Sequence, residues 1–348
     1  MEPAIPDGIE DIDDDWLSQA MGVPVRIVDI DDIGTGVGMI GAIYRATLEG
    51  DCPDTVVIKM PGLDETARFT AQILRLNIRE VGFYRELAAE SPIRVPHCHF
   101  GAVDEETHQF VLVLEDVGSY RAVNQIEGMG RADAEQAVDE LAAWHAHWWG
   151  QAGPIVERGT AVTIRDPIYP MLLPPVFSDG WAKVRGAMSV PRSVETVADG
   201  WVEALPQMLG SLGTAQSTLV HGDYRADNMF FDDDGRIVLL DFQVIGESVP
   251  VGDLAYFVTG SLSPATASEI EPGLYERWLR ALVDEGVPES ETGGMWDIYR
   301  GAVLFCVCYP MIAGAGMDLT DERQRGLLEA TFERFERAAD ELSLTDLL

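Results

Sequence analysis

The chain has 348 residues, 47% of them hydrophobic, so it can bury a sizeable core as one large domain or as two lobes. Its formal net charge is −35, from 24 basic and 59 acidic residues, and such a surface repels nucleic acids and anionic membranes. The four cysteines form no CxxC pair and the acidic first residues carry no signal-peptide core, so we expect a reduced, cytoplasmic protein.

The first 117 residues are predicted to form a small lobe around an antiparallel sheet of about five strands. Alternating or short apolar runs indicate these strands at residues 25–33, 40–48, 55–59, 97–103 and 109–115. A short helix is expected at 12–21 and a long one at 65–89. The long helix carries one apolar stripe at helical spacing: Phe69, Ile73, Leu76, Phe83, Tyr84 and Leu87.

Glycines between the first two strands, Gly36, Gly38 and Gly41, fit the pattern GxGxxG. A dinucleotide-binding fold requires a helix directly after such glycines, but here an alternating strand follows. A glycine-rich hairpin over phosphates fits better, because backbone N–H groups can approach the phosphate oxygens where side chains are absent. A flexible hairpin without a ligand is the alternative.

Two charged residues of the small lobe occupy positions where apolar residues are expected. Lys59 ends the apolar run of the third strand, and it is one of only two lysines in the chain. Glu80 falls in the middle of the apolar stripe of the long helix. Because a buried charge needs an opposite partner, we expect Lys59 and Glu80 to pair. A local pair of Glu80 with Arg75 or Arg79 is the alternative.

The remainder of the chain is predicted to be mainly helical, around a polar strand–loop unit at residues 217–243. Helical patterns occur near residues 131–149, 194–210, 265–285, 292–315 and 320–342. Residues 164–181 contain four prolines and are expected to be the least regular piece. The uncharged run at 301–317 is short for a membrane span and contains a proline, so we expect a buried core helix there.

Three oxygen-bearing side chains lie at or beside short apolar strands. Asp223 and Asn228 belong to the stretch "HGDYRADNMFF", and Asp241 ends the next strand. Phosphoryl transfer needs a carboxylate that orients and deprotonates the attacking hydroxyl. It also needs amide and carboxylate oxygens that hold magnesium against the nucleotide phosphates. These three residues have that chemistry in a suitable order.

Taken in order, the glycine hairpin, strand lysine, helix glutamate, HxDxxxxN-type loop and strand-end aspartate resemble the protein-kinase-like phosphotransferases. Within them, the chain is similar to the aminoglycoside phosphotransferase and choline kinase group, and in motif style to ecdysteroid kinase-like enzymes. The supporting stretches are "LVHGDYRADNMFF", "VLLDFQVIGESVPVGDLAYFVTGS", "FVLVLEDVG" and "LAAWHAHW". No APE-like activation segment is apparent, which argues against a protein substrate.

The resemblance implies an α+β, bilobal protein-kinase-like fold. A small antiparallel-sheet lobe at 1–117 would bind the nucleotide, and a larger, mainly helical lobe at 118–348 would carry the catalytic loop, metal site and acceptor pocket. The resemblance implies that Asp223 is the catalytic base and that Asn228 and Asp241 are the magnesium ligands. Lys59 would contact the α- and β-phosphates of ATP and pair with Glu80. The backbone from Glu115 to Val117 would bind the adenine. Asp253 would brace the catalytic loop in a structural role.

The predicted function is therefore that of a small-molecule kinase that uses ATP and Mg²⁺ to phosphorylate a hydroxyl group. The apolar side chains of 164–181 would suit a lipophilic alcohol if they line the acceptor pocket, and would otherwise only pack this segment down. The acidic surface would instead suit a cationic acceptor. The alternatives are an aminoglycoside-modifying phosphotransferase and a catalytically silent, nucleotide-binding pseudokinase scaffold.

Overall fold

The computed structural model describes residues 2–34, 41–213 and 216–348, and the chain divides into two compact units. The first unit comprises Met1–Arg121 together with Phe230–Val244. The second comprises Ala122–Met229 and Ile245–Leu348. A hairpin from the later part of the sequence thus belongs to the same unit as the N-terminal sheet.

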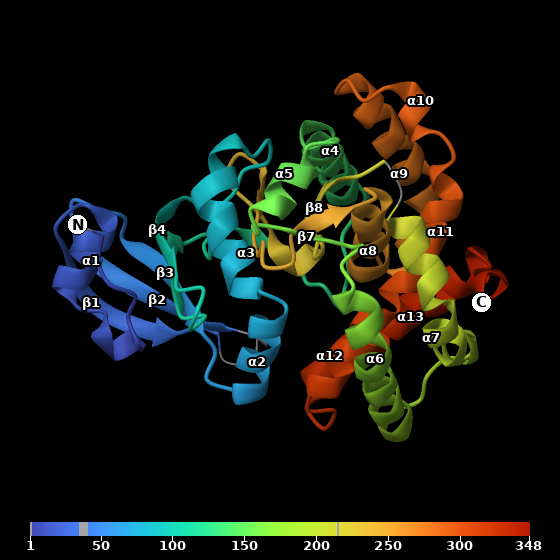
Figure 1. Ribbon diagram of the computed structural model, residues 1–348, viewed down its shortest axis with the longest axis horizontal. Coiled ribbons are helices and arrows are strands. Elements are labelled where there is room, and N and C mark those ends of the chain that lie inside the picture. The colour runs from blue at the N-terminus through green and yellow to red at the C-terminus, as the bar shows by residue number, and fades with distance from the viewer. Residues whose placement is uncertain (1, 35–40, 214–215) are drawn as a thin grey trace. The chain divides into compact units, whose positions relative to one another are not determined.

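The first unit contains the predicted antiparallel sheet of five strands (Figure 1). Its strands are β1 (Val25–Asp32), β2 (Gly41–Gly50), β3 (Thr55–Pro61), β4 (Cys98–Val103) and β5 (Phe110–Glu115). The order is β1-β2-β3-β5-β4, and every neighbouring pair is antiparallel. The register places Lys59 of β3 between Ile43 of β2 and Leu112 of β5. The alternating apolar pattern therefore predicted this sheet correctly.

The two faces of the sheet have different neighbours. The N-terminal elements η1 (Ile9–Asp11) and α1 (Asp14–Met21) lie against one face. The buried core there includes Leu17 of α1 with Val56 and Ile58 of β3. Because side chains alternate along a strand, Lys59 points to the opposite face. That face packs against α3 (Leu76–Gly82).

The predicted long helix at 65–89 is wrong in its continuity. The segment consists of α2 (Glu65–Ile73), α3, a π-helical turn η2 (Phe83–Leu87) and a 3₁₀ turn η3 (Ala88–Glu90). Arg75 interrupts it with a left-handed backbone, φ 53°, which ends one helix and turns the next away from it. As a result, Phe69 and Ile73 of the predicted apolar stripe are 62% and 39% exposed.

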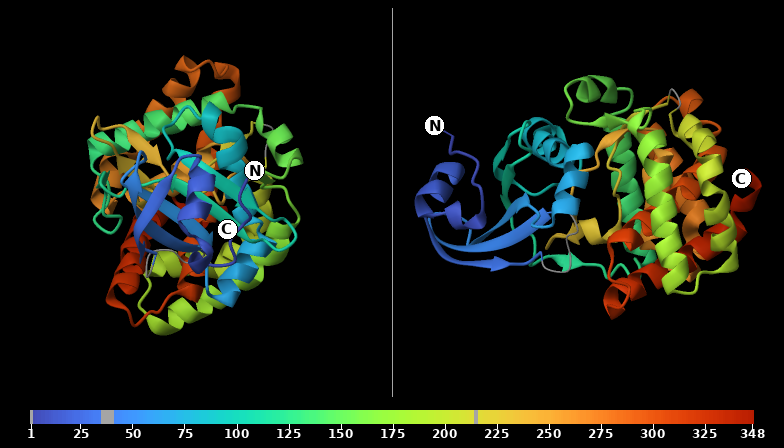
Figure 2. Two further views of the ribbon diagram at one scale, coloured as in Figure 1. Left: turned by 90° about the vertical axis from the view of Figure 1, so that its left-hand side faces the viewer. Right: turned by 60° about the horizontal axis from the view of Figure 1, so that its bottom comes forward.

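The second unit is mainly helical, as predicted, and several of its helices run side by side in the right-hand view of Figure 2. Its helices are α4 (Arg131–His147), α5 (Ala152–Glu157), α6 (Ile168–Ala187), α7 (Arg192–Leu212), α8 (Val251–Ser261), α9 (Pro264–Asp284), α10 (Glu289–Thr292), α11 (Met295–Cys306), α12 (Cys308–Gly316), α13 (Glu322–Glu341) and the 3₁₀ turn η5 (Leu344–Leu347).

Two small three-stranded sheets flank the polar loops. One has the order β10 (Ile237–Leu239), β9 (Met229–Phe231) and β6 (Arg121–Ala122). The other consists of β7 (Val162–Thr163), β11 (Gly246–Ser248) and β8 (Thr218–Val220). The short 3₁₀ helix η4 (Ala226–Asn228) leads directly into β9.

The expectation that residues 164–181 are irregular is wrong, because α6 is a helix of 20 residues with Pro174 and Pro175 inside it. A proline inside a helix removes a hydrogen bond and costs about 3 kcal/mol. Tertiary packing compensates for this cost. Phe177 is buried and its ring stacks on that of Trp201, 4.3 Å away. At Gly180 the missing side chain lets α6 approach α12 so closely that a Cβ would overlap a carbonyl oxygen.

Residues 295–316, which cover α11 and α12, form the one helical stretch of the described chain that is long and apolar enough to cross a membrane. In the structure, 56% of its most apolar window is buried. Helix α11 packs against α7 and α8, and α12 packs against α6. Both helices therefore contribute to the core of the second unit.

Candidate active site

Lys59 and Glu80 form the predicted ion pair inside the first unit. The Lys59 Nζ atom lies 2.8 Å from Glu80 Oε1, and the Glu80 side chain is only 2% exposed. The alternative partners of Glu80 make other contacts. Arg75 pairs with Glu105, and Arg79 donates a hydrogen bond to the carbonyl oxygen of Leu74.

Asp241 is the second carboxylate beside Lys59, with its Oδ1 atom 3.6 Å from Lys59 Nζ. Its backbone has φ 65°, a left-handed conformation that is costly for a residue other than glycine. The neighbouring ring of Phe242 stacks on Phe83 at 3.5 Å, directly after the helix that carries Glu80. This stacking holds the turn at Asp241 against the helix of the ion pair.

Burial and charge act in opposite directions on this cluster. Burial acts to lower the pKa of Lys59, but the charges of Asp241 and Glu80 outweigh it and raise the pKa above its ordinary value. Burial acts in the opposite direction on Glu80, and it is the main cause that raises the pKa of this carboxylate. Lys59 therefore stays protonated and presents a fixed positive charge between two carboxylates.

One oxygen of Asp241 is suited to a metal ion. Asp241 Oδ1 is buried and accepts no hydrogen bond from the residues that the structure describes. Asp241 Oδ2 accepts a hydrogen bond from Gln243 Nε2 at 3.2 Å. Among the described residues the charge of Asp241 Oδ1 is balanced only by the Lys59 ammonium at 3.6 Å, so a hard divalent cation such as Mg²⁺ would satisfy it further.

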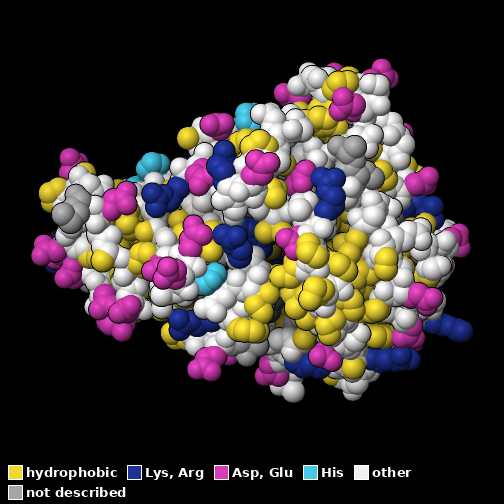
Figure 3. All heavy atoms as spheres, viewed as in Figure 1, with side chains coloured by type: hydrophobic (Ala, Val, Ile, Leu, Met, Phe, Trp, Pro, Cys, Tyr) yellow, Lys and Arg dark blue, Asp and Glu magenta, His cyan; other side chains and the backbone are white. Residues whose placement is uncertain are grey.

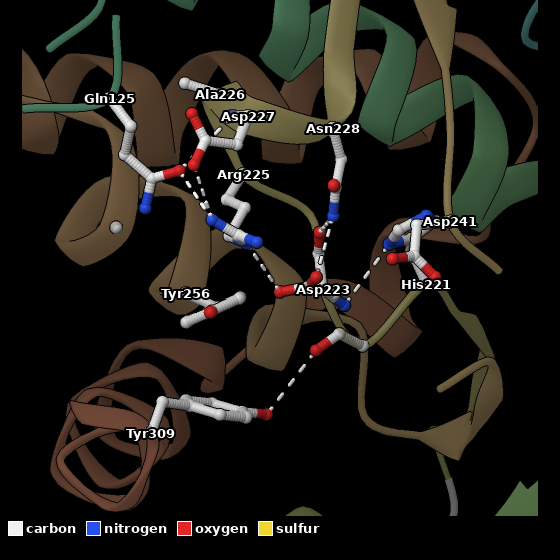
Figure 4. Close-up of polar contacts among 12 residues, drawn as sticks. Gln125, His221, Asp223, Arg225, Ala226, Asp227, Asn228, Asp241, Tyr256 and Tyr309 are labelled. Carbon is white, nitrogen blue, oxygen red and sulfur yellow. Dashed lines mark hydrogen bonds and ion pairs between the residues drawn. The ribbon is translucent and has the colours of Figure 1, made fainter. Parts of the chain in front are cut away.

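Asp223 and Asn228 come together in the loop between β8 and β9 in the second unit (Figure 4). Asn228 Nδ2 donates to the Asp223 carbonyl oxygen at 2.8 Å and to Asp223 Oδ2 at 2.7 Å. Arg225 Nε donates to Asp223 Oδ1 at 3.0 Å. The carboxylate is thus held from both sides, and the nitrogen of Asn228 is committed to Asp223, which leaves the amide oxygen as the atom that would bind a cation.

Asp253 braces this loop, as predicted. Its two carboxylate oxygens accept hydrogen bonds from the backbone N–H groups of His221 at 2.7 Å and Gly222 at 2.8 Å. His145 Nε2 lies 3.2 Å from Asp253 Oδ2, and Trp278 Nε1 donates to His145 Nδ1. Burial lowers the pKa of His145, so the ring is neutral and links the loop to α4 and α9.

Sequence reasoning missed His145 and Arg225 as parts of this site. The stretch "LAAWHAHW" was one of the stretches that carried the family resemblance, but it gave no reason to connect His145 with Asp253, which is 108 residues away. Arg225 was within the quoted loop, and its position two residues after Asp223 was the available signal.

The predicted adenine-binding segment lies at the end of β5. The Glu115 carboxylate accepts hydrogen bonds from Arg94 Nη2 at 2.6 Å and from the backbone N–H of His97 at 3.0 Å. The carbonyl oxygen of Val117 accepts the N–H of Tyr120. The Glu115 side chain is therefore engaged within its own unit, and the predicted adenine contact concerns only the backbone.

The predicted phosphate hairpin lies largely outside the described residues, since these do not include Gly36 and Gly38. At its described ends, the N–H groups of Ile33 and Gly34 both donate to the carbonyl oxygen of Ile43. A Cβ atom at Gly41 would lie 3.5 Å from Lys59 Cε. The end of the hairpin therefore runs close to the side chain of Lys59.

The fold is that of the protein-kinase-like phosphotransferases. Residues 70–290, well over half of the chain, match the sequence model of the phosphotransferase enzyme family. The chain therefore belongs to this family, in agreement with the resemblance to aminoglycoside phosphotransferases and choline kinases. No curated protein sequence matches the chain closely enough to count as a relative.

Solved structures with the same fold cover nearly the whole chain. A choline kinase from Cryptosporidium parvum Iowa II has a TM-score of 0.59 at 10% identity, over 99% of this chain and 95% of that chain. Aminoglycoside 2'-phosphotransferase-IIIa, solved as a GDP complex, has 0.55 at 13% identity, over 90% and 94%. Amicoumacin kinase, solved with AMP-PNP and Ca²⁺, has 0.55 at 14% identity, over 89% and 88%. At such identities the likeness concerns the fold alone.

Proposed function

We propose that this protein is a kinase that uses ATP and Mg²⁺ to phosphorylate a hydroxyl group of a small molecule. The observation that carries the proposal is the cluster of Lys59, Glu80 and Asp241. It combines a fixed cation with a buried carboxylate oxygen that lacks a hydrogen-bond donor among the described residues. A triphosphate and its metal would use both features. The AMP-PNP complex of the amicoumacin kinase supports ATP as the nucleotide.

In this proposal, Lys59 contacts the α- and β-phosphates and Glu80 holds its amine in place. The hairpin with Gly36 and Gly38 covers the phosphates with backbone N–H groups, and the backbone from Glu115 to Val117 binds the adenine. We assign the nucleotide to a lobe at 1–117 and the acceptor to the lobe at 118–348.

Asp223 would accept the proton of the acceptor hydroxyl as its oxygen attacks the γ-phosphate. Asn228 and Asp241 would hold Mg²⁺, which neutralises the negative charge of the phosphates when it is bound. β9 begins directly after Asn228, and β10 ends two residues before Asp241. Because a hairpin returns the chain to the end at which it started, this connectivity supports the proposal that both residues serve one metal ion.

The acceptor is proposed to be a lipophilic alcohol. Residues 168–176 of α6 are all apolar, yet none of them is buried, and Met171 is 76% exposed. Figure 3 shows hydrophobic side chains gathered over this helix. By contrast, Phe177 and Trp181 are buried and pack the helix down. We therefore assign the packing role to the second half of the segment and propose that its first half, residues 168–176, lines the acceptor pocket.

Helix α12 supports this acceptor by connecting α6 to the catalytic loop within the second unit. Tyr309 of α12 donates a hydrogen bond from its hydroxyl to the carbonyl oxygen of Gly222 at 3.5 Å (Figure 4). Its ring lies 4.2 Å from that of Tyr256, whose pKa is raised by burial and by the charge of Asp223. Aromatic and apolar groups therefore extend from Asp223 towards α6 and would fit an apolar acceptor body.

A cationic acceptor such as an aminoglycoside is the second candidate, favoured by the net charge of −35. The pseudokinase scaffold is less well supported, because the lysine, the proposed base and both proposed metal ligands are present. The net charge of −35 and the packing of α11 and α12 support the proposal that the protein works in the cytoplasm on a small-molecule partner.

The test is a screen of alcohols and aminoglycosides with labelled ATP and Mg²⁺, run on the wild type and on Asp223→Asn. The proposal predicts transfer of label to at least one alcohol by the wild type and none above background by Asp223→Asn. Nucleotide binding without any transfer would instead favour the scaffold. Growth of an expressing host on several aminoglycosides separates the cationic acceptors.

A further inference from the structure

The guanidinium of Arg225 donates hydrogen bonds to Asp223, Gln125 and Asp227 in the second unit (Figure 4). Its Nε atom donates to Asp223 Oδ1 at 3.0 Å. Its Nη1 atom donates to Gln125 Oε1 at 2.8 Å and to Asp227 Oδ2 at 3.0 Å. The Arg225 side chain is 25% exposed and that of Asp223 19%. This pair is therefore shielded more than an ordinary surface ion pair, which contributes little.

Gln125 is in turn anchored by a buried cation. The main-chain carbonyl oxygen of Gln125 accepts a hydrogen bond from Arg334 Nη2. Arg334 Nη1 donates to the main-chain carbonyl oxygen of Gly260 at 2.7 Å. Arg334 belongs to α13 and is 2% exposed. Gln125 itself is 8% exposed, and its Oε1 atom also accepts the N–H of Asp227. The amide that holds Arg225 thus has a fixed position.

These contacts decide how the Asp223 carboxylate is oriented. Asn228 holds Oδ2, Arg225 holds Oδ1, and Asp253 holds the preceding backbone. If Arg225 were removed, Asp223 Oδ1 would lose this donor, and Asn228 and the Tyr256 side chain would be left to hold the carboxylate, which could then rotate more freely. A side chain that must meet a hydroxyl proton at hydrogen-bond distance loses much of its efficiency when it is displaced.

We propose that Arg225 is a positioning residue for Asp223 and that Gln125 fixes the position of Arg225. This inference rests on the proposed function, because it assumes that Asp223 is the base. Lysine cannot replace Arg225, since a single ammonium group does not reproduce a planar fork that reaches several acceptors at once.

The experiment measures hydrolysis of Mg·ATP with water as the acceptor, detected as ADP release, together with ATP affinity and thermal stability. We expect Arg225→Ala to lower kcat by about 10- to 100-fold with little change in ATP affinity. Gln125→Met, which keeps the side-chain size, should lower kcat by a smaller factor. Arg225→Lys should resemble Arg225→Ala, and added methylguanidinium should restore part of the activity of Arg225→Ala.

The matched control is Arg277→Ala. Arg277 also binds an aspartate through two hydrogen bonds, from Nε and Nη2 to the carboxylate of Asp139, each 2.6 Å long. That pair joins α9 to α4 and does not include a loop residue. We expect Arg277→Ala to keep the wild-type kcat.

The outcomes separate this inference from the proposed function. If the wild type releases ADP, Asp223→Asn does not, and Arg225→Ala equals the wild type, only the inference is overturned. An equal loss in Arg225→Ala and Arg277→Ala, without rescue by methylguanidinium, would also overturn it. If the wild type transfers label to an alcohol but releases no ADP with water, the same variants are compared with that alcohol as the acceptor. If it neither releases ADP nor transfers label to any alcohol of the screen, the proposed function fails, and the inference fails with it.

Discussion

The cluster around Lys59 and the loop around Asp223 hold their charged groups in different ways. Lys59 lies on a strand of the five-stranded sheet, and its charge is fixed by two carboxylates within 4 Å in a buried setting. Asp223 lies on a loop, and its orientation is fixed by donors from Asn228 and Arg225 and by the brace of Asp253. The first region fixes the position of the Lys59 ammonium group, and the second fixes the orientation of the Asp223 carboxylate.

The largest expected effect on turnover comes from a substitution of Asp223, at the centre of the second region. Asp223→Asn keeps the size of the side chain but removes the proposed base, so turnover should fall by about 10³-fold while ATP still binds. Steady-state kinetics and nucleotide titration measure the two quantities. If the variant retained full activity, Asp223 could not be the base.

The next prediction breaks the support of the same loop. Each carboxylate oxygen of Asp253 accepts one backbone N–H, and Asp253→Asn replaces one of these oxygens by an amide nitrogen. The free energy of unfolding should fall by about 3 kcal/mol, because one buried N–H loses its acceptor and faces another donor. Chemical denaturation measures this change. A variant of wild-type stability would show that the loop does not need the brace.

The first region should respond to a change of charge rather than of orientation. Lys59→Met should lower turnover by about 10²-fold, because it removes the cation that we propose to contact the phosphates. It should also destabilise the fold, since Glu80 is left buried without its partner. Adding Glu80→Gln should recover stability but not turnover. Recovery of both quantities would mean that Lys59 serves the fold alone.

The smallest expected effect comes from Lys183, the second lysine of the chain, which serves as a comparison for Lys59. Lys183 Nζ donates to the carbonyl oxygens of Ala315 and Met317 at the end of α12, both at 2.8 Å. Lys183→Met should lower the free energy of unfolding by about 1 kcal/mol, because the two carbonyl oxygens lose a hydrogen-bond donor. The effect is small because the Lys183 side chain is exposed. Turnover should not change. A loss of turnover as large as that of Lys59→Met would contradict the distinction.

The sequence predicted features that depend on local pattern and on the cost of buried charge. Alternation of apolar residues was sufficient for the five strands, and the position of Glu80 within an apolar stripe was sufficient for its pair with Lys59. Both rest on one rule, that apolar faces are buried and buried charges are paired.

The errors have physical causes that lie outside local pattern. A left-handed residue at Arg75 divides the long helix, and nothing in its side chain requires that conformation. Tertiary packing around Phe177 and Gly180 overrides the prolines of α6. The contacts of His145 with Asp253 and of Gln125 with Arg225 join residues about 100 positions apart, so one sequence could not reveal them.

The most direct measurement is a crystal structure of the protein with Mg²⁺ and a nonhydrolysable ATP analogue. We expect one metal–nucleotide complex that is bound by Asn228 and Asp241, with Lys59 on the α- and β-phosphates and the γ-phosphate directed at Asp223. A nucleotide bound elsewhere, or bound without contact to both Lys59 and Asn228, would contradict this expectation.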